Sequence, residues 1–237
     1  MIDMITPEQL AGNLEYVRGA IAQAAGRAGR DAQDVTLIAV SKTVPIELVR
    51  IAYNLGVTDF GENRVQDALP KIAEFQPPDA RWHMIGHLQS NKASKVIGAF
   101  ASVESVDNLR LAQALERHAS RQGISLPVLL QVNVSGETSK EGMSPAEVPE
   151  MARQIVALPH LRVEGLMTIA PIAQNPEETR PVFRQLRLLR DHLRNEVPQC
   201  DWRHLSMGMT DDYRVAIEEG ATIVRIGRAV FGERVYV

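Results

Sequence analysis

The sequence is poor in the features that would tie it to an oxidising compartment or a membrane. It contains a single cysteine, Cys200, which cannot form an internal disulfide and gives no support to a cysteine-based metal site. No run approaches the ~20 apolar residues of a membrane span, and the amino-terminal Asp3, Pro7 and Glu8 are unlike a signal peptide. We therefore expect a cytoplasmic protein that makes no membrane contact.

The sequence also lacks a basic patch and has few aromatic residues. The net charge is −3, and only 5% of the residues are aromatic. This balance gives no electrostatic footprint for a nucleic acid. The remaining composition, 45% hydrophobic and 23% charged, is ordinary for a soluble α/β protein. A length of 237 residues suits one barrel of the (β/α)8 type, which typically has roughly 250 residues.

Apolar, β-branched runs alternate with segments of helical period from residue 35 onward. The strands are expected at 35–40, 59–60, 82–85, 101–106, 128–134, 161–167, 202–206 and 223–226. The helices between them are expected at 45–55, 65–75, 91–97, 108–122, 145–157, 177–196 and 211–219. Eight such units predict a single (β/α)8 TIM barrel domain over residues 1–237. A doubly wound sheet is the alternative, but it does not need eight regular units.

An additional helix is expected before the first strand. Thr6 is a candidate N-cap, Pro7 suits the first helical position and Gln9 completes a capping box. Leu10 and Leu14 begin an apolar stripe at helical spacing. This helix should pack on the outside of the barrel.

A lysine, Lys42, stands directly after the apolar strand that ends at Val40. An ammonium group is costly to desolvate there, so it either reaches out to water or has a lowered pKa and serves as an amine that forms a Schiff base. Position alone favours the first alternative. The other strand ends, which meet Lys42 at the active-site face of a barrel, change the balance.

Glycines follow the seventh and eighth strands, where barrels of this type usually bind phosphate. Ser206-Met207-Gly208 forms the first of these turns and Gly227-Arg228 the second. Each glycine alone could simply permit a turn, but the two together favour a phosphate cradle.

Arg225 lies inside the apolar strand 223–226, where a guanidinium must be paired or serve a ligand. An arginine is one of the known partners of the pyridine nitrogen of pyridoxal phosphate, and it would leave that nitrogen unprotonated. The alternative is a buried salt bridge, for instance to Glu164 on the sixth strand.

Six ordered motifs between about residues 35 and 232 resemble the pyridoxal phosphate homeostasis protein family, single-domain relatives of the amino-terminal barrel of alanine racemase. They are Ser41-Lys42-Thr43, Phe60-Gly61-Glu62-Asn63, His83 to Lys92, Gly165 to Thr168, Leu205 to Met209 and Arg225-Ile226-Gly227.

The resemblance implies a pyridoxal 5'-phosphate site at the mouth of the barrel. Lys42 would hold the cofactor as a Schiff base, and Arg225 would face the pyridine nitrogen. The ring would be lined by Asn63, Met167 and His87, and the phosphate would be held by Ser206, Met207, Gly227 and Arg228. No metal is implied.

The resemblance also implies a carrier of the cofactor and not an enzyme. Alanine racemases add a β domain that supplies a tyrosine as a second acid/base, and racemisation needs a proton acceptor on each face. The sequence ends soon after the last motif, so we expect a protein that buffers the cofactor or delivers it to pyridoxal phosphate-dependent apoenzymes. No exposed heptad seam is visible in the sequence, and we expect a monomer. A weak racemase or transaminase is one alternative. A cofactor-free Schiff-base aldolase is another, but it leaves Arg225 unexplained.

Other polar residues permit two interpretations each. His83, His87, Asn91 and Lys92 could form a polar loop over the site; in the alternative interpretation, Ser90 caps a helix and Lys92 is solvated. Lys140, in the polar loop 135–142, could visit the ligand, although a solvated lysine is the simpler interpretation.

Overall fold

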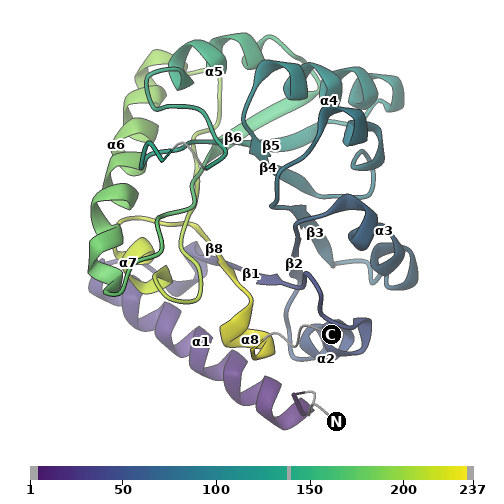
Figure 1. Ribbon diagram of the computed structural model, residues 1–237, viewed down its shortest axis with the longest axis vertical. Helices are drawn as coiled ribbons and strands as arrows, with labels where there is room; N and C mark the ends of the chain where they lie inside the picture. Colours follow the sequence, from purple (N-terminus) through teal and green to yellow (C-terminus); the bar gives the residue numbers. More distant parts are fainter. Residues whose placement is uncertain (1–4, 138–139, 234–237) are drawn as a thin grey trace.

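The computed structural model describes residues 5–137 and 140–233, and across these residues eight parallel strands close into a barrel in sequence order (Figure 1). The strands are β1 (Thr36–Val40), β2 (Asp59–Glu62), β3 (Arg81–Met84), β4 (Ser102–Val106), β5 (Leu126–Gln131), β6 (Leu161–Met167), β7 (His204–Ser206) and β8 (Ile223–Ile226). The closing pair is β1 with β8. The predicted (β/α)8 barrel is confirmed, and a closed sheet excludes the doubly wound alternative.

Helices surround the barrel, as Figure 1 shows. They are α1 (Pro7–Arg27), α2 (Ile46–Asn54), α3 (Val65–Glu74), α4 (Leu109–Gln122), α5 (Val148–Val156), α6 (Arg180–Glu196), α7 (Tyr213–Glu218) and α8 (Arg228–Phe231). The connection from β3 to β4 contains a 3-10 helix, Ser90–Lys95, instead of an α-helix. Within the described ranges, no helix combines the length and the apolar character needed to cross a bilayer.

The additional amino-terminal helix is confirmed as α1. The Thr6 hydroxyl accepts a hydrogen bond from the Gln9 N–H at 3.2 Å, and the Gln9 side chain accepts one from the Thr6 N–H at 2.9 Å. Leu10, Leu14 and Val17 are buried, and burial of each such side chain stabilises the fold by ~1.5–3 kcal/mol. The helix runs along the outside next to α7 and α8 (Figure 1).

Three of the expected helices were wrong in type or start. The segment expected to be an α-helix at 91–97 is the 3-10 helix Ser90–Lys95, a short segment in which Ser and Asn compete with helical hydrogen bonding. The helix expected from 145 starts at Val148, because Glu147 turns back to accept hydrogen bonds from Ser144. The helix expected from 177 begins with a 3-10 turn, and α6 starts only at Arg180.

Most of the apolar core lies between the barrel wall and the helices. Inside the barrel, the apolar cluster is small and consists of Ile38, Leu129, Met167 and Ile223. Buried polar side chains lie next to it within the barrel, above all Arg225. The interior is therefore unusually polar for a fold whose barrel is normally filled by branched apolar side chains.

Candidate functional site

Lys42 follows the strand that lies between the strands preceding Asn63 and Gly227. Val40 pairs with Gly61 on β2, and Ala39 pairs with Ile226 on β8. Lys42 follows β1 by two residues, so the same register continued places it opposite Asn63 beyond β2, whereas Gly227 beyond β8 lies next to Val40. The Lys42 side chain is half-buried at the carboxyl end of the barrel. This is the face on which barrels of this type carry their active sites.

The backbone turns sharply directly after Lys42. Thr43 has a φ of 64°, in the left-handed region that β-branched residues rarely occupy, and its hydroxyl donates a 2.5 Å hydrogen bond to the Lys42 carbonyl. Such strain persists where the surrounding structure imposes it, and it concentrates at functional sites. Nothing in the sequence signalled this conformation.

A buried ion pair anchors the strand end that carries Lys42. Lys71, on α3, lies 2.9 Å from Glu62 Oε1 and donates a 2.7 Å hydrogen bond to the Ser41 carbonyl. The Ser41 hydroxyl donates to the same Glu62 oxygen at 2.7 Å. The three groups fix the backbone next to Lys42. Sequence reasoning missed Lys71, because nothing in α3 marks one lysine as buried.

Arg225 is fixed inside the barrel by polar neighbours. Its guanidinium donates hydrogen bonds to the Ser206 hydroxyl at 2.5 Å and to the Thr168 carbonyl at 2.8 Å. Burial lowers the pKa of Arg225, while the charges of Glu104 and Asp212 act in the opposite direction. The guanidinium stays positively charged inside the barrel, because arginine is effectively always protonated.

The suggested pairing of Arg225 with Glu164 is wrong. Glu164 lies in the middle of β6 and pairs with Arg162 at 2.5 Å. The carboxylate near Arg225 is Glu104, whose Oε2 accepts a 2.6 Å hydrogen bond from the Ser206 hydroxyl. The signal that could have found Glu104 was a lone acid in the middle of the apolar strand 101–106.

Met167 and Ser206 are direct neighbours across β6 and β7. Both are fully buried, and the Met167 side chain packs with Ile38 and Leu129 inside the barrel. The Ser206 hydroxyl is engaged by Arg225 and Glu104. In this arrangement, Met167 and Ser206 form the floor of the site.

The Met207 side chain lies apart from the floor of the site, and His87, also expected to line the ring, lies apart with Asp107 and Glu141. It is fully buried in the core between the barrel and the helices, and its N–H donates to the Ile223 carbonyl at 3.1 Å. The next residue, Gly208, has a φ of 95°, and a Cβ atom there would lie 2.6 Å from the Ala216 Cβ. Only glycine fits this turn.

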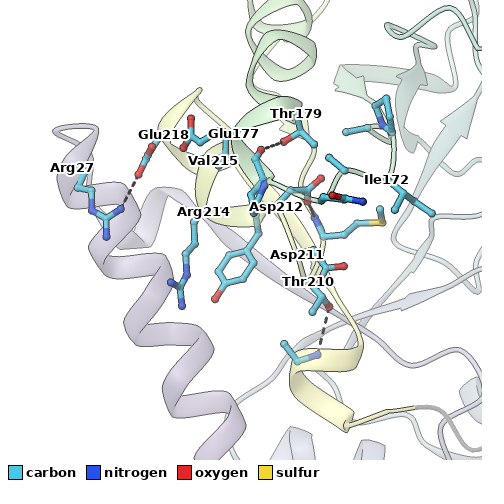
Figure 2. Close-up of a pocket in the computed structure, with 18 of the residues that line it drawn as sticks. Arg27, Ile172, Glu177, Thr179, Thr210, Asp211, Asp212, Arg214, Val215 and Glu218 are labelled. Atoms are coloured by element: carbon cyan, nitrogen blue, oxygen red, sulfur yellow. Dashed lines mark hydrogen bonds and ion pairs between the residues drawn. The ribbon is translucent and has the colours of Figure 1, made fainter.

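The loops after β7 and β8 are tied to each other. The Arg228 guanidinium donates to both carboxylate oxygens of Asp211, at 2.6 and 2.7 Å, and the Ala229 N–H donates to the Thr210 hydroxyl at 3.4 Å. Figure 2 shows Thr210 and Asp211 on the loop next to α8. Gly227 precedes α8, next to Val40 of β1.

A cavity of about 750 Å3 lies beside these loops, between the segments after β6 and β7 (Figure 2). Ile172, Asp212 and Arg214 contribute to its wall, and the buried hydroxyl of Tyr213 has no hydrogen-bond partner among the described residues. Burial raises the pKa of Asp212, against a lowering effect from the Met209 N–H bond.

His87, Asp107 and Glu141 form the group that could hold a metal ion within the described part of the chain. Their candidate ligand atoms lie within 4.8 Å of one another. The same atoms also permit a simple ion-pair arrangement, since His87 Nδ1 lies 3.5 Å from Asp107 and 3.8 Å from Glu141. Burial raises the pKa of Asp107.

Two lysines with open roles have surface partners. Lys92 donates to the Gln66 side chain at 3.1 Å, and Lys140 lies 3.1 Å from Glu137. The Lys92 contact fits the solvated interpretation, whereas the Lys140 side chain is only 22% exposed and lies near His87. Of the polar loop 135–142, Thr138 and Ser139 lie outside the described residues.

The site thus follows one arc of the barrel mouth, from β6 through β7, β8 and β1 to β2. Met167, Ser206, Arg225, Gly227, Lys42 and Asn63 succeed one another along it. An amine, a buried guanidinium and a glycine-bearing turn on one arc can bind a small anionic ligand that carries a carbonyl group.

The sequence matches one family model over nearly its whole length. The model is described as alanine racemase, N-terminal domain, and it matches residues 13–235. A relative from Aquifex aeolicus named pyridoxal phosphate homeostasis protein is 46% identical over 229 residues, which cover 97% of this chain and 98% of the relative.

Solved structures agree with the sequence comparison. PipY of Synechococcus elongatus, solved without PLP, superposes with a TM-score of 0.86 at 39% identity and covers 94% of this chain and 100% of its own. The same protein with PLP bound gives a TM-score of 0.83 at 38% identity, with the same coverage.

Proposed function

The chain belongs to the pyridoxal phosphate homeostasis protein family, and on that premise we propose that it binds pyridoxal 5'-phosphate and buffers or delivers it without strong catalysis of its own. The observation that carries the proposal is that Lys42 follows β1, between the strands that precede Asn63 and Gly227, and that the second of these strands also carries Arg225. Lys42 would hold the cofactor covalently through its amine. We treat residues 1–237 as one cofactor-binding domain.

The fit to this cofactor rests first on Arg225. Bound pyridoxal phosphate supplies an aldehyde that reacts with amines and a ring that withdraws electrons best when its nitrogen is protonated. A guanidinium has five N–H groups, and among the described residues Arg225 donates two of them to Ser206 and Thr168. Another can donate to the ring nitrogen. Because arginine keeps its proton, it would leave that nitrogen unprotonated and the ring a weak electron sink.

The phosphate would be held mainly by backbone N–H groups. The side chains of Ser206 and Arg228 already bond to Glu104 and Asp211, which favours a structural role for both. The backbone at Gly227 and Arg228 lies at the barrel mouth and can accept an anion. Ser206 would then serve the cofactor through Arg225. Asn63 and Met167 would line the ring.

The positions of the tyrosines support weak catalysis at most. Tyr16 and Tyr53 lie on the outer helices α1 and α2, and Tyr213 is buried in the core outside the barrel. Tyr236 lies outside the described residues. A two-base reaction needs a second proton acceptor opposite Lys42, and none of the described tyrosines is placed on the arc of site residues. We propose a cytoplasmic monomer whose partners are pyridoxal phosphate-dependent apoenzymes.

A transfer experiment tests delivery. The cofactor-loaded protein is mixed with an apoenzyme of a pyridoxal phosphate-dependent transaminase, and recovery of transaminase activity is compared with recovery from free cofactor. We expect stoichiometric recovery of activity. A loaded protein that neither restores activity nor exchanges its cofactor would contradict the proposed role.

A weak racemase or transaminase is the competing function, because the chain shares its domain with alanine racemase and Lys42 would supply the amine. Exchange of the alanine α-hydrogen in deuterated solvent separates the two. Steady exchange at enzymatic rates, abolished by Lys42→Ala, would favour the enzyme over the carrier.

A further inference from the structure

A second cavity, of about 350 Å3, occupies the amino-terminal half of the barrel interior. Residues at every second position of several strands line this cavity. They include Thr36 and Ile38 on β1, Ser102 and Glu104 on β4, and Arg162 and Glu164 on β6. Alternate residues of a strand share one face, so these side chains point into the barrel. The interior of such barrels is normally a packed core. This cavity lies at the end of the barrel opposite Lys42.

An unsatisfied carboxylate oxygen lies at the inner end of the cavity. Glu104 is only 1% exposed, and its Oε1 has no hydrogen-bond partner among the described residues. The nearest ring nitrogen, Nδ1 of His83, is 4.0 Å away. Both His83 nitrogens are already engaged at 2.8 Å, by Ser102 and Asp59. A buried charged acceptor without a donor is costly, so the position calls for a donor from outside the chain.

Three arginines surround the outer end of the cavity. The side chains of Arg81, Arg162 and Arg203 are 58%, 50% and 55% exposed. Each is paired with one acid, Asp59, Glu164 or Asp201. A guanidinium carries five N–H donors, so these pairs leave donors that can bind an anion at the rim.

From these two ends we infer that the cavity binds a small zwitterion. A cationic nitrogen of the ligand donates to Glu104 Oε1 at the inner end, and its carboxylate, or an anion of similar charge, is bound by the arginines at the rim. A volume of about 350 Å3 is at the lower end of the usual range for ligand pockets, which suits a molecule of the size of an amino acid. The cavity lies at the end of the barrel opposite Lys42, and it meets the cofactor site only through Glu104, whose other oxygen accepts the Ser206 hydrogen bond.

Guanidinoacetate is a suitable probe, because it carries both charged ends and has no primary amine that could react with the aldehyde of bound pyridoxal phosphate. Isothermal titration of the full-length, cofactor-loaded protein should detect one site. Acetate carries only the carboxylate and methylguanidine only the cationic group. Each should bind at least about tenfold more weakly than guanidinoacetate, a difference of ~1.4 kcal/mol in binding free energy.

Variants assign the binding to this cavity. Glu104→Gln, Arg162→Gln and Arg203→Gln should each weaken guanidinoacetate binding by about tenfold or more. Arg153→Gln is the matched control, because Arg153 pairs with Glu150 and Glu196 on the outer surface and should leave binding unchanged. Glu104 is buried and its variant can fail to fold, but the two rim variants are half-exposed and keep the test decisive.

Three results would overturn the inference. No binding of guanidinoacetate would mean that water alone fills the cavity. Equal binding of acetate or methylguanidine would remove the need for two charged ends. Binding that is unaffected in both Arg162→Gln and Arg203→Gln would place the probe elsewhere. An unchanged visible absorption spectrum during the titration separates every one of these results from events at Lys42.

Discussion

The guanidinium of Arg225 donates a 2.5 Å hydrogen bond to the Ser206 hydroxyl, which itself donates a 2.6 Å hydrogen bond to Glu104. A neutral hydroxyl thus joins a buried cation to a buried carboxylate that lies 121 residues away in the chain. Each charge is costly inside a protein unless it is compensated. The bridge lets the barrel hold an arginine at the position where the proposed cofactor ring needs one.

Removal of the bridge should weaken both the fold and the cofactor site. In Ser206→Ala, Arg225 and Glu104 each lose a hydrogen-bond partner, and we expect a loss of about 1–3 kcal/mol in the free energy of unfolding. Affinity for pyridoxal phosphate should fall several-fold, because Arg225 is no longer held. Urea unfolding and cofactor titration measure the two effects. Ser120→Ala, on the exposed side of α4, is the control, and equal behaviour of the two variants would contradict the assigned bridge.

The anchor beneath Lys42 gives a second prediction. Lys71→Met leaves the fully buried Glu62 without its cation, and removal of one partner of a buried pair costs ~3–5 kcal/mol. Lys92→Met removes a lysine with one exposed neutral partner, and it should change the free energy of unfolding by less than about 0.5 kcal/mol. Urea unfolding of both variants checks this. A cost below 1 kcal/mol for Lys71→Met would mean that Glu62 does not depend on it.

Two glycine substitutions should act in opposite directions. Gly208→Ala forces a Cβ atom to 2.6 Å from the Ala216 Cβ at a φ of 95°, so it should destabilise the protein by about 2 kcal/mol and weaken cofactor binding. Gly19→Ala lies on the exposed side of α1, with nothing within 4 Å of the added atom, and should stabilise it by ~0.5–1 kcal/mol. Thermal unfolding of the two variants shows whether each substitution raises or lowers the stability of the protein. Stabilisation by Gly208→Ala would refute the tight turn.

A buried glutamate at the end of α7 makes stability depend on pH. Burial would raise the pKa of Glu219, but hydrogen bonds from Arg184, Arg180 and Arg187 on α6 outweigh it and lower the pKa to about 2. The usual value is 4.5, so the folded state holds this proton less tightly than the unfolded chain. The stabilisation is therefore complete above about pH 4.5 and is lost as the pH falls towards about 2.

Glu219→Gln should remove this pH dependence. At about pH 7 the variant should be clearly less stable than the wild type, and the difference should shrink as the pH falls from about 4.5 towards about 2. Urea unfolding over this range measures it, with Glu178→Gln on the exposed surface as the control. A difference that stays constant with pH would contradict the arginine cluster around Glu219.

Much of the fold could be predicted from the sequence, because local patterns determine it. The β-branched runs gave all eight strands to within a few residues, and the Thr6 to Gln9 box gave the start of α1. The errors lay where local hydrogen bonds override the apolar period, as at Ser144 and Glu147 before α5.

The gathering of the candidate site residues at one end of the barrel could also be predicted, since a barrel brings its strand ends together. The partners of these residues could not be predicted. The neighbours of Arg225, the burial of Lys71 and the turn at Thr43 depend on contacts between distant elements, which no local pattern encodes. The cavity around Glu104 depends in the same way on side chains from strands all around the barrel.

The most direct test of the account is the visible absorption spectrum of the purified protein before and after borohydride reduction, with peptide mapping of the reduced adduct. We predict an absorption band that borohydride abolishes, an adduct on Lys42, and loss of both in Lys42→Ala, which should keep weak binding through the phosphate contacts. A colourless protein that does not take up added pyridoxal phosphate, or an adduct on Lys140 or Lys92 in its place, would contradict the central claim.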